Sequence, residues 1–111
     1  SPVGVVDFWN YLGGGGLSAG STVRVEFNGI NRINCINLTV KLSSIGKMAN
    51  TILDCNSPAN TSLTRIIVYT PVVATLNTCT FPITTQQAEA ACTSPTNNLV
   101  NFYYGYTRIN N

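Results

Sequence analysis

The pattern of apolar and polar residues predicts a chain built mainly from β-strands. Apolar and polar residues alternate over 21–27 and again over 33–42, where the second run would turn Asn37 toward solvent. A period of two is typical of strands that bury one face. β-Branched and aromatic residues predict further strands over 63–70, 72–81 and 99–107, and a short one over 51–53.

One segment has a helical pattern instead. Residues 84–91 are rich in Ala and Gln, and Thr84 and Gln87 have the spacing of a capping box, in which each side chain bonds the backbone N–H of the other residue. We expect one short helix here, ending near Cys92 and before Pro95.

These elements predict an all-β fold: a single small β-sandwich, Ig-like or related, with about six or seven strands, one short helix and stapling disulfides. We expect three parts in the chain. Residues 1–12 form an apolar N-terminal arm, residues 13–20 a glycine-rich hinge, and residues 21–111 the sandwich domain.

The arm has three alternative placements. It is strongly apolar and is followed by four consecutive glycines, so its side chains must insert into an apolar site. It is either the first strand of its own sheet, a donor strand that completes the sheet of a neighbouring copy, or a helical anchor at a membrane interface. In the donor-strand alternative, the subunit interface is formed by Val5, Phe8, Trp9 and Leu12.

The four cysteines, Cys35, Cys55, Cys79 and Cys92, are expected to form two disulfides. None lies in a CxxC pair, which argues against a zinc ribbon or a redox motif. We expect sequential pairing, Cys35 with Cys55 and Cys79 with Cys92. Disulfides are typical of oxidising compartments, which favours a secreted, cell-surface protein.

Two N-glycosylation acceptor patterns begin at Asn37 and Asn60. Asn60 lies in a Ser-, Pro- and Asn-rich segment, where a loop would be accessible to the modifying enzyme. Glycans on these residues would also explain how a surface with few charged residues stays soluble.

The composition excludes several classes of function. Six Lys and Arg residues against four Asp and Glu give a net charge of +2, and His is absent. Six scattered cations form no patch that follows phosphates, so we expect no nucleic-acid partner. Without His, or a hydrolase or nucleotide-binding motif, we expect no enzyme, no catalytic residue, no cofactor and no metal. No apolar stretch is long enough to span a membrane.

The layout of an apolar arm, a small β-sandwich, a polar uncharged exterior and glycosylation patterns resembles that of donor-strand filament subunits of archaeal and bacterial surfaces. We therefore expect a secreted structural subunit of a pilus-like filament, assembled head to tail with itself through the arm. The alternative is a monomeric binding module or toxin-like domain. Such a module would recognise a glycan or a receptor on a host or cell surface through the Tyr-rich strand at 102–106.

Overall fold

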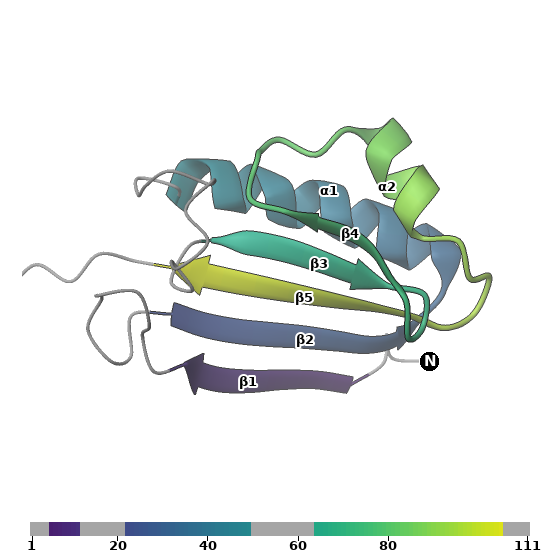
Figure 1. The fold of residues 1–111 in the computed structure, drawn as a ribbon, viewed down its shortest axis with the longest axis horizontal. Coiled ribbons are helices and arrows are strands. Elements are labelled where there is room, and N and C mark those ends of the chain that lie inside the picture. The colour runs from purple at the N-terminus through teal and green to yellow at the C-terminus, as the bar shows by residue number, and fades with distance from the viewer. Residues whose placement is uncertain (1–4, 12–21, 50–63, 106–111) are drawn as a thin grey trace, which may run out of the picture.

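The protein folds as one antiparallel sheet with helices, and the expected β-sandwich is wrong. The computed structural model describes residues 5–11, 22–49 and 64–105, and Figure 1 shows their arrangement. Five strands lie in the order β1-β2-β5-β3-β4. The elements in chain order are β1 (Val5–Tyr11), β2 (Thr22–Ile30), α1 (Arg32–Ala49), β3 (Arg65–Tyr69), β4 (Ala74–Thr78), α2 (Thr85–Ala91) and β5 (Asn98–Gly105).

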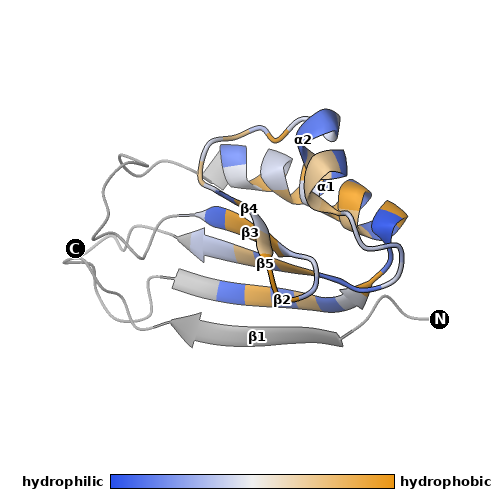
Figure 2. Ribbon diagram, turned by 45° about the vertical axis from the view of Figure 1, so that its right-hand side comes forward, coloured by the Kyte–Doolittle hydropathy of each residue, from blue (hydrophilic) through white to orange (hydrophobic). Residues whose placement is uncertain are grey.

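The cross-strand register divides the sheet into two faces. Ile66 of β3 lies opposite Phe102 of β5, and Val68 lies opposite Val100. These four side chains are buried beneath the helices, so this is the helix-covered face. The next position along each strand points to the opposite, helix-free face, because side chains in a strand alternate. Figure 2 shows the resulting alternation of hydrophobic and hydrophilic residues along β2.

The main departure from the expected fold is α1, which replaces the strand predicted at 33–42. The helix begins after Asn31, whose Oδ1 accepts a hydrogen bond from the Asn34 backbone N–H at 2.8 Å, as an N-cap does. The buried positions recur at helical spacing, but most of them are small or polar: Cys35, Thr39, Leu42, Ser43 and Gly46. The large apolar residues Ile33 and Ile45 are exposed. The alternation of apolar residues over 33–42 therefore predicted a strand where the chain forms a helix.

The second helix confirms the expected short helix at 84–91. Thr84 is the N-cap of α2, and both hydrogen bonds of the capping box with Gln87 are present. Ala88 and Ala91 turn toward the core, where small side chains allow α2 to pack closely on α1. The helix ends at Cys92, which is its C-cap.

The remaining strands overlap the expected segments: β3 and β4 lie within 63–70 and 72–81, whereas β2 continues past 27 to Ile30 and β5 begins at Asn98. Pro71 lies in the turn between β3 and β4, where the Thr70 N–H bonds the Val73 carbonyl at 2.9 Å. Proline in that turn leaves the strand ladders intact. The strand expected at 51–53 lies outside the described residues.

The two helices cover only part of the sheet. α1 packs mainly on β5 and β3, and α2 packs on α1 and β4. Figure 1 shows β1 at the edge remote from both helices. The core of the described chain lies between α1, α2, the strands β3 and β5 and the end of β2, and it comprises chiefly Ile30, Leu42, Ile66, Val68, Ile83, Ala88, Ala91, Val100 and Phe102.

Candidate functional site

The N-terminal arm forms strand β1 at one edge of the sheet. It pairs antiparallel with β2, with Val5 opposite Asn28, Phe8 opposite Val25 and Trp9 opposite Arg24. Because β1 lies at one end of the strand order, it forms a ladder with β2 alone among the described strands. The side chains of the expected interface residues in β1, and all of Leu12, lie outside what the structure describes, as does the expected hinge at 13–20.

The helix-free face carries a row of aromatic and cationic residues across the centre of the sheet. Tyr103 of β5 lies opposite Arg24 of β2 on one side and opposite Arg65 of β3 on the other. All three side chains are half-buried. Nη1 of Arg65 donates a hydrogen bond of 2.7 Å to Oδ1 of Asn77 on β4, which holds the guanidinium across the sheet. On the other side of Arg24, its register partner is Trp9 of β1.

A second row, two residues further along each strand, is acidic and amide-rich. Asn101 of β5 lies between Glu26 of β2 and Ile67 of β3, and Asp7 of β1 lies opposite Glu26. Asn101 is only 4% exposed, and within the described part of the chain its Oδ1 has no hydrogen-bond donor. An unsatisfied buried acceptor costs roughly 1–3 kcal/mol. This face therefore contains a polar atom whose hydrogen-bonding capacity the described fold leaves unused.

The Tyr-rich strand divides its aromatic residues between the two faces. Phe102 is buried on the helix-covered face, and the ring of Tyr104 on the same face lies 6.4 Å from it, centroid to centroid. Only Tyr103 among the described tyrosines of β5 points to the helix-free face, and Tyr106 lies outside the described residues. Within the described part of β5, that face therefore carries one tyrosine and not a ladder of them.

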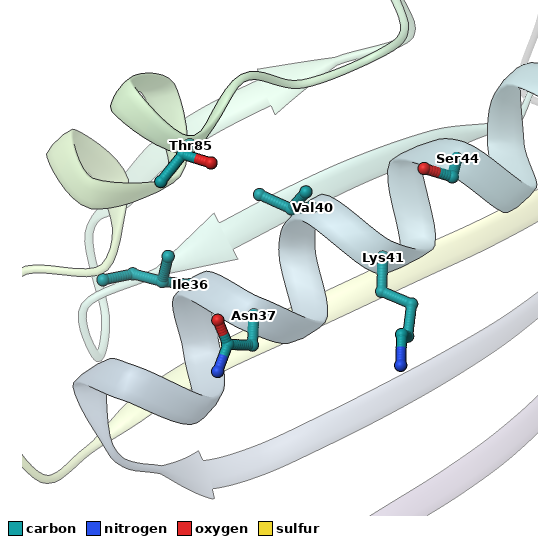
Figure 3. Close-up of a pocket in the computed structure, with 6 residues that line it drawn as sticks. All are labelled: Ile36, Asn37, Val40, Lys41, Ser44 and Thr85. Atoms are coloured by element: carbon teal, nitrogen blue, oxygen red, sulfur yellow. The ribbon is translucent and has the colours of Figure 1, made fainter.

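An open groove of about 620 Å³ lies between the two helices and includes Asn37. Figure 3 shows Ile36 and Val40 pointing toward Thr85 of α2, with Asn37 and Lys41 further round α1. Asn37 is exposed, but on a helix and not on the polar face of a strand as expected. Thr39, the third residue of the glycosylation acceptor pattern that begins at Asn37, is fully buried. Asn60, the other expected glycosylation residue, lies outside the described residues.

The disulfide pairing differs from the sequential one expected. Cys35 in the first turn of α1 bonds Cys92 at the end of α2, across 57 positions of sequence. Cys79 is also disulfide-bonded, and Cys55 lies outside the described residues. The expected bridge from Cys79 would have fixed the short helix to the sheet, whereas Cys92 at the end of α2 is bonded to Cys35 of α1 instead. A disulfide is typical of proteins in oxidising compartments.

The polar residues of the helix-free face are not marked by any motif in the sequence. The alternation over 21–27 predicts only that Arg24 and Glu26 lie on the polar face of their strand, and nothing in the sequence aligns them with Asn101. Their alternation with buried residues was visible, but the strand order that makes them neighbours was not.

Comparison with known proteins finds no matching family model, no similar curated protein and no similar solved structure. Neither described helix is long and apolar enough to cross a lipid bilayer. Among the described side chains, no group of three or more Asp, Glu, Cys or His residues is placed to hold a metal ion.

Proposed function

We propose that the protein is a secreted structural subunit that assembles into an extracellular filament by exchanging strand β1 between copies. The observation that carries the proposal is the place of β1 at the edge of the sheet, where it pairs with β2 alone among the described strands. Figure 1 shows β1 at the edge remote from the helices. Its removal would leave a contiguous sheet of four strands still backed by both helices.

Exchange is favoured by the chemistry of strand pairing. A β1 strand from a second copy makes the same backbone hydrogen bonds to β2 as the chain's own strand does, so the two arrangements differ little in pairing energy. Withdrawal of β1 exposes the edge of β2, and an exposed edge is a template for another strand. One subunit thus supplies both a donor strand and an acceptor edge.

The segment between β1 and β2 is long enough for such an exchange. Residues 12–21 contain four consecutive glycines, and ten residues can span up to about 33–36 Å when extended. That reach exceeds the width of the sheet, in which neighbouring strands lie about 4.8 Å apart. Head-to-tail exchange leaves a free donor and a free acceptor at the two ends, so it produces an open filament and not a closed dimer.

The disulfide Cys35–Cys92 supports the extracellular setting, since such bonds persist outside reducing compartments. It links α1 to α2 and does not involve β1. The part of the fold that accepts a donor strand is therefore stapled independently of the strand that leaves.

Paired cysteines at register partners test the exchange directly. Phe8 lies opposite Val25, and partners on neighbouring strands have the Cα separation that a disulfide requires. In assembled protein oxidised after assembly, the double variant Phe8→Cys, Val25→Cys should give a ladder of covalent oligomers on a non-reducing gel. The same variant oxidised as a dilute monomer should be locked within one chain and should not polymerise.

The matched control is Ile33→Cys with Val25→Cys, which introduces an exposed cysteine that is not a register partner. It should polymerise without forming a ladder. Negative-stain microscopy should show filaments for the wild type and none for the locked monomer. A wild-type chain that stays monomeric at high concentration, with only intrachain cross-links in the double variant, would refute the proposal and favour the monomeric binding module.

A further inference from the structure

We infer that the helix-free face of the sheet binds a neutral oligosaccharide across β2, β5 and β3, with Tyr103 at the centre of the site. This inference goes beyond filament assembly and does not depend on it, because Tyr103, Arg24 and Arg65 all lie in the part of the chain that follows the exchanged strand.

The first reason is the supply of hydrogen-bonding groups around an aromatic ring. A sugar ring carries hydroxyl groups along its edge, and each of them can both donate and accept a hydrogen bond. The C–H groups of the sugar ring pack on the face of an aromatic side chain. On this face, Arg24 and Arg65 flank Tyr103 as donors, and the carboxylate of Glu26 is an acceptor one row away. The two arginine Cα atoms lie two strand spacings apart, roughly 10 Å, on either side of the half-buried Tyr103.

The second reason is Asn101. Its Oδ1 is buried and lacks a hydrogen-bond donor among the described residues, in the row next to Tyr103. Asn101 is nine-tenths buried or more. A hydroxyl group that enters between Glu26 and Ile67, with a small movement of these half-buried side chains, would supply the missing donor.

The third reason is the arrangement of charges, which separates a neutral ligand from other occupants. The row of Arg24 and Arg65 lies about 6.8 Å, two residues along the strands, from the row that contains Glu26. A polyanion such as single-stranded nucleic acid would meet this carboxylate as well as the arginines. A second apolar sheet would bury both charge types, and the cores of protein interfaces are depleted of charge. An uncharged, hydroxyl-rich ligand meets neither penalty and can hydrogen-bond to both rows.

The orientation of Arg65 completes the argument. Its hydrogen bond to Asn77 fixes the guanidinium before a ligand arrives, which lowers the entropic cost of binding. Asn77 is exposed on the edge strand β4, so its amide extends the set of polar groups to the rim of the face.

The test measures binding of cellohexaose, mannohexaose and chitohexaose to the full chain by isothermal titration calorimetry. At least one of them should bind. For that sugar, Tyr103→Leu should weaken affinity by about tenfold, because it removes the ring and keeps an apolar side chain, whereas Tyr103→Phe should retain most of the affinity. Arg65→Gln should also weaken binding severalfold.

Lys41→Gln is the matched control for Arg65→Gln, because it removes the same charge from an exposed position on α1. It should bind as the wild type does, and thermal unfolding should show that every variant is folded. Three results would overturn the inference: no binding of any of the three sugars at millimolar concentration, equal affinity of the wild type and Tyr103→Leu, or tighter binding of oligo(dT) than of any sugar. The last result would assign the face to single-stranded nucleic acid.

Discussion

Replacing Cys35 and Cys92 together by Ala should lower the free energy of unfolding by about 4 kcal/mol. The bond closes a loop across 57 positions. In the chain-entropy description, a loop of that size restricts the unfolded chain by about 4 kcal/mol at 25 °C. The value is a large share of the stability of a domain this size, which is typically about 5–15 kcal/mol.

The disulfide lies at a place where other contacts also hold the two helices together, so its loss should lower the stability and keep the fold. Both cysteines are fully buried, and they join the first turn of α1 to the C-cap of α2. The end of α2 is also held by Thr70 and Thr75, whose hydroxyls donate to the Ala91 carbonyl at 3.0 and 2.7 Å. These hydrogen bonds should preserve the fold of the double variant, so the loss should appear as reduced stability of a native-like structure.

The assay is urea denaturation without reductant, followed by circular dichroism, for the wild type and the double variant. Ser44→Ala, an exposed substitution on α1, is the control and should change stability by less than about 0.5 kcal/mol. A loss below about 1 kcal/mol for the double variant, with an unchanged dependence on urea, would refute the reasoning. If the double variant is unfolded in water, the predicted loss of about 4 kcal/mol holds only if the free energy of unfolding of the wild type is below about 5 kcal/mol. The same titration measures that value.

Three further substitutions test the packing and hydrogen bonds that position the two faces. Thr84→Ala should cost about 1 kcal/mol in urea denaturation by removing the capping box with Gln87, and Thr84→Ser should recover most of it. Asn98→Leu should cost more than about 3 kcal/mol, or prevent folding, because this fully buried amide bonds Thr70 Oγ1, the Ser94 backbone and the Ile30 carbonyl; a loss below 1 kcal/mol would contradict the network. Gly46→Ala should lower the melting temperature despite the better helix propensity of Ala, because its Cβ would lie 3.0 Å from the Phe81 ring; a higher melting temperature would show that the ring moves aside.

The strands show how much local pattern predicts. The sequence predicts strands at 21–27, 63–70, 72–81 and 99–107, and each segment overlaps one in the structure: β2, β3, β4 and β5. Alternating burial in β3, with Ile66 and Val68 inward, is the direct outcome of a period of two. The short helix was equally predictable, because a capping box is made by residues only three positions apart.

The α1 segment shows where local pattern failed. Its apolar residues alternate as in a strand, yet the side chains that face the sheet include Cys35, Thr39 and Ser43, which a hydropathy pattern does not mark as core. The signal that favoured a helix was the N-cap residue Asn31, next to a turn-forming Asn-Gly pair. A strand at this position adds to the number of strands expected and so favours a sandwich, whereas the helix that is present covers one face of a single sheet.

The sequence by itself determined the local elements whose signals lie within a few residues: four strands, the capped helix, the apolar arm with its glycine-rich connection, and a composition with few charges. Only the tertiary structure decided the strand order, the Cys35–Cys92 bond and the faces on which residues meet. Tyr103 has arginine neighbours because β2 and β3 both pair with β5, although these strands are far apart in sequence. The strand order that makes them neighbours depends on the burial and hydrogen bonding of the whole chain. It therefore cannot be read from any short segment of the sequence.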